Sequence, residues 1–338
     1  MSVSSRMKDL FLYTLFLFLI YLFFLGNENM LTSLPFSFDE EAKSIFIAFL
    51  TILVEALPFI ILGAFFSSVI QLFVSEQMIL RSIPKNPLAS IIASVCIAAL
   101  TPICECAIIP VVRRLIHKGV PVHAGAVLLT GAPILNITVF TSTYYAFPNQ
   151  PEIYLGRLFL CLITALITGW VMYLIFFRSN VLRVKKDDFI STKKINENKK
   201  GQSKWKAIIH HTSHEFFQVG KYFIIGAFLA SLAQYYLADS KVFNGVANPL
   251  AETGFMMGLA FLMSICSEAD AFIAASFSNL VRPEAILGFL VFGPIMDLKN
   301  FLAMFACFRL RFIFFYIITV TVSIFVLSIS FAIFFMEG

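Results

Sequence analysis

The sequence is dominated by long apolar runs that contain almost no charged residues. Several of these runs, such as 153–177, reach the roughly 18 residues at which an apolar segment indicates a membrane span. The chain of 338 residues is 59% hydrophobic and 13% charged, whereas soluble domains carry about 25% charged residues. The sequence therefore predicts an all-α polytopic membrane protein and excludes a soluble globular domain.

The positive charge of the chain is concentrated in one polar loop, 178–206, which holds ten Lys or Arg and three acidic residues. Because Lys and Arg are favoured on the cytoplasmic side, this loop is predicted to be cytoplasmic, either fixing the topology alone or also contacting membrane lipid head groups. Arg6 and Lys8 precede an apolar run at 10–25. That run is predicted to be a retained helix with a cytoplasmic N-terminus. Nothing in the sequence predicts nucleic-acid binding.

One stretch inside an apolar segment stands out, Thr-Pro-Ile-Cys-Glu-Cys-Ala-Ile-Ile-Pro at 101–110. Glu105 stands between Cys104 and Cys106, and a proline lies on either side. An ionisable group at membrane depth costs about 2.5–3.5 kcal/mol on insertion scales and marks a functional site. The prolines remove backbone donors, and broken backbone is found in membranes only where it is buried in protein or lines a cavity. This stretch is therefore predicted to be a transport or redox site.

Three motifs recur in the same order in the second half of the chain, which predicts an internal repeat. Residues 61–71 match 224–234, with Gly, Ala, Phe, Ser and Gln coincident. Cys266 falls opposite the Cys-Glu-Cys motif, and Gly-Pro-Ile-Met-Asp at 293–297 falls opposite Ala-Pro-Ile-Leu-Asn at 132–136. The predicted divisions are an N-terminal helix and outer loop, a first repeat, a basic cytoplasmic loop and a second repeat, at 1–41, 42–177, 178–206 and 207–338.

The distribution of charge predicts how the two repeats are oriented. If 86–116 crossed the membrane once, both Arg113–Lys118 and the loop 178–206 would face outward, against the positive-inside tendency. A re-entrant hairpin that enters from the cytoplasm and turns near Cys104 leaves both clusters inside. The equivalent segment 250–280 then enters from outside, so the repeats have inverted topology, as in many secondary transporters. This gives about seven transmembrane helices plus two re-entrant hairpins, although the lengths of these segments leave full spans open.

The two predicted hairpin tips combine thiols with carboxylates. Thiolates are soft ligands that suit thiophilic metals and metalloids, and carboxylates suit harder cations or protons. Cys104, Cys106 and Cys266 are predicted to bind a thiophilic species, such as a metal ion or a trivalent arsenic compound, unless they merely pack. With the two residues that follow the proline-containing breaks, the predicted substrate-binding residues are Cys104, Glu105, Cys106, Asn136, Cys266, Glu268, Asp270 and Asp297.

Some of the polar residues have simpler alternative roles. Asp297 either forms an ion pair with Lys299 or completes the substrate site together with Asn136. Because burial favours the uncharged form of a carboxyl group, the acidic residues of the site could also couple transport to protons. His210 and His214 share a helix face, and they either bind a metal at the cytoplasmic mouth or simply lie at the membrane interface.

Two classes of function other than transport stay open. Cys104 and Cys266, one in each repeat, fit a membrane thiol-redox electron carrier, although Cys-Glu-Cys lacks the redox Cys-x-x-Cys spacing. The chain could instead be a structural subunit of a larger complex. It contains no Walker A motif for ATP and no Ser/His/Asp nucleophile motif. The sequence therefore predicts neither an enzyme nor a bound cofactor.

The motifs at 101–110 and 131–136, with their second-half counterparts at 266 and 293–297, resemble those of the predicted permeases of the YraQ/ArsP type. This family includes organoarsenical efflux permeases. The resemblance covers about residues 42–310. It implies a multi-pass permease of the bacterial inner membrane and, as for some members of the wider family, a second membrane-protein partner.

The same resemblance implies export of the substrate through the paired cysteines, which map to Cys104 and Cys106. Glu105 and Ala107 stand where the family tends to have a small residue followed by Gly. This departure moves the expected substrate from an organoarsenical toward a metal cation or another substrate.

Overall fold

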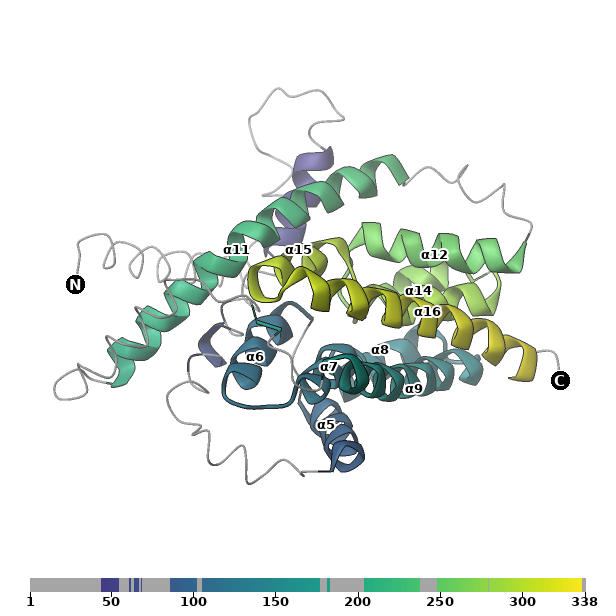
Figure 1. Cartoon of the computed structure of the whole chain (residues 1–338). Coiled ribbons are helices and arrows are strands. Elements are labelled where there is room, and N and C mark those ends of the chain that lie inside the picture. Colours follow the sequence, from purple (N-terminus) through teal and green to yellow (C-terminus); the bar gives the residue numbers. More distant parts are fainter. Residues whose placement is uncertain are drawn as a thin grey trace.

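The structure is a computed structural model, and the regular secondary structure of its described part is helical (Figure 1). It describes residues 44–54, 61, 64–66, 68, 86–101, 105–176, 181–182, 204–237, 248–278 and 280–335. The labelled helices of the first half are α5 (Pro87–Leu100), α6 (Glu105–His117), α7 (Val122–Gly131), α8 (Ile137–Ala146) and α9 (Pro151–Phe176). Those of the second half are α11 (Lys204–Leu237), α12 (Pro249–Met263), α13 (Asp270–Ser276), α14 (Pro283–Ile295), α15 (Leu298–Cys307) and α16 (Leu310–Phe335).

Three segments of the described chain are long and apolar enough to cross a membrane. They are Pro151–Phe176, Pro283–Cys307 and Leu310–Phe331, with mean hydropathies of 2.3, 1.5 and 2.5. The 26 residues of α9 extend roughly 39 Å, which exceeds the hydrocarbon thickness of about 30 Å. These helices confirm the predicted all-α membrane protein. The span predicted at 10–25 lies outside the described residues.

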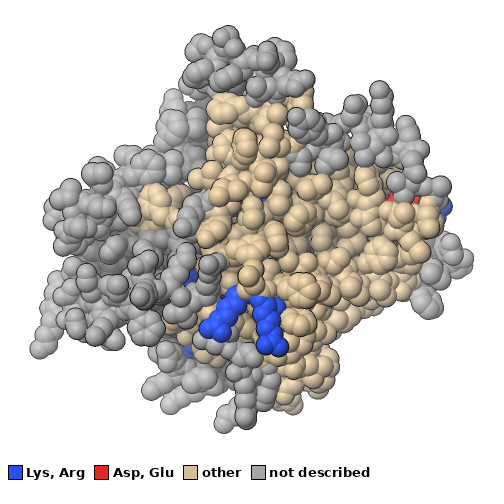
Figure 2. All heavy atoms as spheres, turned by 45° about the horizontal axis from the view of Figure 1, so that its top comes forward, with Lys and Arg blue, Asp and Glu red and all other residues tan. Residues whose placement is uncertain are grey.

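Large apolar side chains face outward along the long helices. Leu174 on α9 and Phe314 on α16 are 64% and 61% exposed. Figure 2 shows a face of the molecule on which uncharged residues cover most of the described surface and Lys and Arg are few. Because hydrocarbon tails do not solvate charge, such a surface is what a chain embedded in a bilayer requires.

Each half contains a short helix with the same kind of start. The N-cap of α5 is Asn86, whose side chain accepts a hydrogen bond from Leu88 N at 3.2 Å. The N-cap of α12 is Asn248, whose side chain accepts from Leu250 N at 3.1 Å. Both helices then begin with proline, and Asn at the N-cap followed by Pro strongly favours a helix start. With 14 and 15 residues, these helices extend only about 21–23 Å.

A helix break with a polar cap follows in each half. The break between α7 and α8 ends at Asn136, whose side chain accepts from Val139 N at 2.9 Å. The break between α14 and α15 ends at Asp297, whose side chain accepts from Asn300 N at 2.6 Å. In both cases the cap satisfies a backbone donor three residues later, which stabilises a helix start by roughly 1 kcal/mol.

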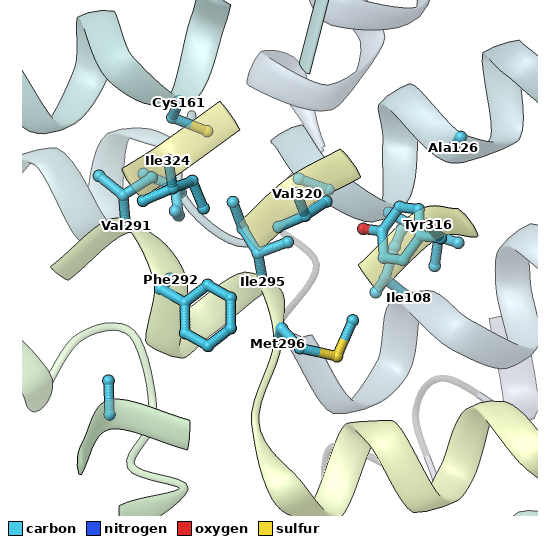
Figure 3. Packing of buried hydrophobic residues seen from close by; sticks show 14 of the residues in the cluster. Ile108, Ala126, Cys161, Val291, Phe292, Ile295, Met296, Tyr316, Val320 and Ile324 are labelled. Carbon is cyan, nitrogen blue, oxygen red and sulfur yellow. The ribbon is translucent and has the colours of Figure 1, made fainter. Parts of the chain in front are cut away.

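The two halves pack directly against each other. α9 lies along α16 and also contacts α14, and in Figure 1 the teal helices α7 to α9 lie below the green and yellow helices α12, α14 and α16. Figure 3 shows Ile108 and Cys161 of the first half among buried residues of the second, such as Ile324. Thr130 and Tyr316 add a buried hydrogen bond between the halves, with 3.1 Å between their hydroxyl oxygens.

Shorter helices make further contacts across the same interface, and α11 packs against α15 within the second half. α6 contacts α15, and α8 contacts α13. α11 lies along α15 and approaches it closely at Gly226, where an added Cβ would lie 2.7 Å from the Cα of Lys299. The missing side chain at Gly226 therefore allows α11 to contact the backbone at the start of α15.

Candidate functional site

The Cys-Glu-Cys motif lies where one short helix ends and another begins. α5 ends before Thr101, and α6 begins at Glu105. Glu105 and Cys106 are 2% and 7% exposed, while Cys104 lies outside the described residues. The chain therefore places a carboxyl group inside the protein at the N-terminus of α6, where the helix dipole favours negative charge.

The break between α14 and α15 places a second carboxyl group and an amine in the same interior. Asp297 caps α15, and Lys299 is the second residue of that helix. They are 0% and 3% exposed. A buried ammonium group loses its hydration and must be compensated by partners, so the contacts of Lys299 are central to this region.

Lys299 joins the motif of the first half to the helix break of the second. Its Nζ lies 2.8 Å from Glu105 Oε1 and 2.8 Å from Asp297 Oδ2, and it donates to Ser264 O at 2.7 Å. The contacts with Glu105 and Asp297 are ion pairs, and the contact with Ser264 is a hydrogen bond. The predicted pair of Asp297 and Lys299 is thus present, and it extends to Glu105. We call Glu105, Ser264, Asp297 and Lys299 the Lys299 cluster.

The turn after α12 is tied to this cluster through a strained residue. Ser264 ends α12 with φ 50° and ψ 45°, a left-handed conformation that costs a non-glycine residue roughly 1–2 kcal/mol. Leu298 N donates to Ser264 Oγ at 3.1 Å, and Lys299 binds its carbonyl. Backbone strain of this kind persists where the surroundings fix it, and it is common at functional sites.

A second buried charge cluster lies where α9 meets the turn before α13. Arg157 Nη2 lies 2.8 Å from Asp270 Oδ2 and 3.3 Å from Ser267 O, and Arg157 Nη1 donates to Thr143 Oγ1 at 2.8 Å. Arg157 and Asp270 are each 2% exposed. We call these four residues the Arg157 cluster. It connects α8, α9 and α13, and so it also joins the two halves.

Glu268 lies beside the Arg157 cluster and makes looser contacts. It is half-buried, its Oε1 lies 3.5 Å from Thr138 Oγ1, and its carbonyl accepts a hydrogen bond from Ser142. Thr138 is the second residue of α8, as Lys299 is the second residue of α15. In both halves, therefore, a glutamate near the start of a short helix contacts the second residue after a helix break in the other half.

A small cavity with room for about one water molecule opens beside Glu105. Its wall is apolar apart from a few polar groups, and it includes the prolines of both helix breaks. Three buried oxygens on its lining residues, both carboxyl oxygens of Glu105 and Asn300 Oδ1, have no hydrogen-bond partner within the described structure, although Glu105 Oε1 lies at ion-pair distance from Lys299. The lining residues are Glu105, Ile108, Ile109, Leu129, Pro133, Pro294, Ile295, Asn300, Met304 and Tyr316.

The predicted thiol ligands are only partly within the described chain. Cys106 lies within electrostatic range of Lys299, and Cys266 is half-buried in the turn before α13. No three His, Cys, Asp or Glu side chains of the described residues gather into a metal site. Metal binding therefore stays a prediction. Outside the described part lie Cys104 and the side chains of His210 and His214 on α11.

Asn136 is engaged by the helix break itself. Its Oδ1 accepts from Val139 N and, at 2.6 Å, from Thr138 Oγ1, while its Nδ2 donates to Ala132 O at 3.2 Å. The geometry gives Asn136 a capping role, and its predicted contact with substrate stays a prediction.

Sequence reasoning did not identify Arg157, Thr138 or Ser264. Arg157 carried a usable signal, because it is a single charge within the apolar run 153–177, the same kind of signal that identified Glu105. Thr138 and Ser264 carried none, since hydroxyl side chains are common in membrane helices, where they bond to their own backbone.

Comparisons with known proteins agree with this architecture. A family described as predicted permeases matches residues 41–333. The UPF0718 protein YcgR of Bacillus subtilis is 41% identical over 276 residues, which cover 82% of this chain and 92% of that protein. A protein of Streptococcus mutans, named as a two-component membrane permease complex subunit, is 34% identical over 265 residues, covering 78% and 87% of the two chains. No solved structure matches the chain.

Proposed function

Because this chain belongs to the predicted-permease family of the ArsP type, we propose that it is a secondary permease that exports a thiophilic metal or metalloid species. The substrate binds where the two halves meet, between the Cys-Glu-Cys motif and the turn that contains Cys266. The protein lies in the bacterial inner membrane, with its N-terminus and the loop 178–206 in the cytoplasm.

The observation that carries this proposal is the pair of reciprocal contacts at the helix breaks. Glu105 lies 2.8 Å from Lys299, and Glu268 lies 3.5 Å from Thr138. Polar and charged groups inside a membrane protein are expensive and mark substrate or ion pathways. In secondary transporters such groups lie on broken helices near the midplane, at the interface of two repeats.

Two inverted repeats, within 42–177 and 207–338, account for this arrangement. Helices α5 to α9 and α12 to α16 follow the same order of a short helix, a second short helix, a broken helix and a long helix. The equivalent caps at Asn136 and Asp297 support the same pairing. α5 and α12 are too short to cross a bilayer alone, which fits re-entrant hairpins that enter from opposite sides and meet near mid-depth.

The thiols supply the substrate chemistry. Cys104, Cys106 and Cys266 offer soft ligands for a thiophilic centre, and Glu105, Glu268 and Asp270 adjust the charge around it. Cys106 is buried directly after Glu105 and within electrostatic range of Lys299. A negatively charged thiolate complex at this position would therefore be close to a fixed positive charge.

A second membrane protein is proposed to work beside this chain. The proposal rests on the Streptococcus mutans relative, whose name describes a subunit of a two-component membrane permease complex. Native gel electrophoresis of membranes solubilised in mild detergent tests it. The expected band contains this chain and a second membrane protein in fixed ratio, and a band of this chain alone contradicts it.

Transport by cysteine variants tests the thiol site. Everted membrane vesicles are incubated with radioactive cadmium or arsenite in the medium, and Cys104→Ser and Cys106→Ser are compared with Cys96→Ser, whose side chain is exposed on α5. The first two variants are expected to lose accumulation of the transported probe at normal membrane levels, and Cys96→Ser is expected to retain it. Wild-type transport by the Cys104→Ser/Cys106→Ser double variant would refute the thiol-ligand role.

Thiol labelling from one side of the membrane tests the inverted topology. In a background without native cysteines, Lys118→Cys and Gln150→Cys are exposed to an impermeant maleimide added to intact cells. The hairpin arrangement predicts that Gln150→Cys is labelled and Lys118→Cys is protected until the membrane is opened. Labelling of Lys118→Cys in intact cells indicates that 86–116 is a full span.

A further inference from the structure

We propose that two groups of aromatic side chains contact the lipid head-group regions on the two sides of the bilayer, and that the Arg157 cluster therefore lies about one helical turn beneath one membrane surface. The Tyr154 group, at the end of α8 and the start of α9, consists of Tyr144, Tyr145 and Tyr154. The Trp170 group, near the end of α9, consists of Trp170 and Tyr173. This placement concerns how the chain lies in lipid and does not depend on transport.

The Tyr154 group combines exposed rings with close ring contacts. Tyr144 and Tyr145 are 44% and 69% exposed, and the ring of Tyr144 meets that of Tyr154 edge-on, with 5.4 Å between the centroids. A tyrosine ring is apolar, whereas its hydroxyl group requires a hydrogen-bond partner. Such a side chain is favoured at the membrane interface, where the ring contacts hydrocarbon and the hydroxyl group reaches head groups or water.

The Trp170 group has the same character at the other end of α9. Trp170 is 42% exposed, and its ring centroid lies 5.8 Å from that of Tyr173. Tyr173 also meets the ring of His123, at the start of α7, edge-on at 5.3 Å. Trp and Tyr are the residue types that are enriched at both membrane interfaces. Each end of α9 therefore presents aromatic rings that carry a polar atom.

The distance between the two groups matches the thickness of a bilayer. At about 1.5 Å per residue, Tyr173 lies about 29 Å from Tyr154 along α9, and the hydrocarbon core of a bilayer is about 30 Å thick. The large exposed side chains between them are apolar, with Leu155, Phe159 and Leu166 at 51%, 48% and 36% exposed. With this interval, α9 crosses the hydrocarbon with little tilt and little deformation of the bilayer.

The charged residues of α9 agree with these two levels. Glu152 is exposed and lies just before Tyr154. The other charged residue in the sequence of α9 is Arg157, which is 2% exposed and paired with Asp270. The outward surface of α9 between the two aromatic groups thus carries no charge, as contact with hydrocarbon requires.

The charged residues of α16 give an independent check on the level of the Trp170 group. α16 lies along α9, and the rings of Phe312 and Phe176 are 5.7 Å apart. The sequence of α16 after Phe312 contains no charged residue, whereas Arg309 and Arg311 come just before Phe312 and are exposed. These arginines therefore lie near the level of Phe176, about one turn beyond the Trp170 group. There an arginine can keep its guanidinium group among head groups.

The same levels set the depth of the Arg157 cluster and of Glu268 beside it. Arg157 follows Tyr154 by about 4.5 Å along α9, and its partner Thr143 directly precedes Tyr144 on α8. The cluster therefore lies just beneath the head groups. Glu268, which is half-buried, is close to water instead of the hydrocarbon centre. A partly exposed carboxyl group costs less at that depth than at the centre.

Tryptophan fluorescence in brominated lipid tests the two levels. The chain has two tryptophans, Trp170 and Trp205, so Trp205→Phe leaves Trp170 as the single emitter. This full-length variant is reconstituted into bilayers whose acyl chains carry bromine either near the head group or near the chain end, because bromine quenches tryptophan only at short range. The ratio of shallow to deep quenching is expected to exceed one for Trp170. Trp170→Phe/Trp205→Phe provides the background for single tryptophans at other positions.

Single tryptophans introduced along α9 in that background map the depth around Arg157. Leu155→Trp and Phe159→Trp lie on either side of Arg157 in the sequence, at exposed positions, and Leu166→Trp lies further along the same surface. The quenching ratio is expected to exceed one for Leu155→Trp, as for Trp170, and to fall below one for Phe159→Trp and Leu166→Trp. If Leu155→Trp does not fold, Tyr154→Trp takes its place.

The outcomes that overturn the placement are distinct from each other. Quenching of Trp170 by neither lipid shows that protein covers it, whether a partner or a second copy of the chain. A quenching ratio that is equal at all positions, or that changes steadily from one end of α9 to the other, shows that the two groups do not lie at opposite interfaces. Because no substrate is used, these results leave the thiol permease standing, and absence of cadmium or arsenite transport leaves the depth profile unaffected.

Discussion

The Lys299 cluster contains two carboxyl groups and one cation. The Arg157 cluster contains the same number when the neighbouring Glu268 is included, but the two clusters differ in burial. Around Lys299 both carboxylates are enclosed, with Glu105 and Asp297 at 2% and 0% exposed. Around Arg157 only Asp270 is enclosed, and Glu268 is half-buried. Solvent therefore reaches one carboxyl group beside Arg157, that of Glu268, whereas both carboxyl groups around Lys299 are shielded from solvent.

This difference assigns different roles to two corresponding places in the fold. The buried Arg157–Asp270 pair is a one-to-one pair with further hydrogen bonds, which suits a fixed connection between α9 and α13. In the Lys299 cluster two buried carboxyl groups share one ammonium group, and the cluster includes a strained residue, Ser264. Stored charge and strain of this kind are typical of binding sites. We therefore expect the first to be mainly structural and the second to be the functional centre.

The largest effect is expected from removing the cation of each cluster. Lys299→Met leaves two buried carboxylates without a partner, and Arg157→Met leaves one. Breaking a buried ion pair costs about 3–5 kcal/mol, so both variants are destabilised and Lys299→Met is the worse of the two. Unfolding of the purified protein by a denaturing detergent measures the difference.

The matched control neutralises the whole Lys299 cluster at once. Glu105→Gln and Asp297→Asn, added to Lys299→Met, remove the uncompensated charges and are expected to restore most of the lost stability. A single variant Lys299→Met that is as stable as wild type would show that the cluster does not hold α6 against α15.

An intermediate effect is expected at the close approach of α11 to the Lys299 cluster. Gly226→Ala places a Cβ against the backbone of Lys299, and overpacking of this kind costs about 1–3 kcal/mol. Gly220→Ala, in the same helix, meets no atom within 4 Å, and it is expected to be neutral or slightly stabilising because Ala favours helix more than Gly. Melting temperatures that fall equally in both variants contradict the packing of α11 on α15.

A smaller effect is expected at the cap of the first-half break. Asn136→Ala removes the acceptor for Val139 N and is expected to cost about 1 kcal/mol. Asn136→Ser keeps an uncharged cap acceptor and serves as the matched variant, and it is expected to retain more stability than Asn136→Ala. If Asn136→Ser loses as much stability as Asn136→Ala, the cap is not the reason that Asn136 matters.

The smallest effect is expected at the contact that corresponds to Glu105 and Lys299. Thr138→Val removes the 3.5 Å contact to Glu268 and one bond to Asn136, and its expected cost is about 1 kcal/mol or less. Thr141→Val is the control, because among the described residues its hydroxyl bonds to the carbonyl of Ile137 in its own helix. If Thr138→Val lost as much stability as Lys299→Met, the Glu268–Thr138 contact and the Glu105–Lys299 contact would not differ in the way proposed.

Much of the fold could be predicted from hydropathy, because a helix in lipid must satisfy its own backbone and needs about 20 apolar residues to cross. The span predicted at 153–177 is α9, and the breaks predicted from prolines lie before Asn136 and Asp297. The Asn-Pro starts at Asn86 and Asn248 are a further repeated feature that the motif comparison did not use.

The site was predicted less completely, because partners distant in sequence leave no local signal. Glu105 was identified as a rare charge at membrane depth, and Asp297 by its position after a proline-containing break. Their shared contact with Lys299 depends on how α6 packs on α15, which no single stretch of sequence encodes. Arg157 was detectable by its charge alone, but its pairing with Asp270 was not.

Alkylation of Cys106 in membranes tests the central claim most directly. The rate is followed by mass spectrometry with and without cadmium or arsenite, and Cys96 provides an internal reference in the same chain. If the substrate binds at the Cys-Glu-Cys motif where the two halves meet, the probe that is transported slows alkylation of Cys106 and leaves Cys96 unchanged. Equal rates with and without both probes would contradict a thiol site at the interface of the two halves.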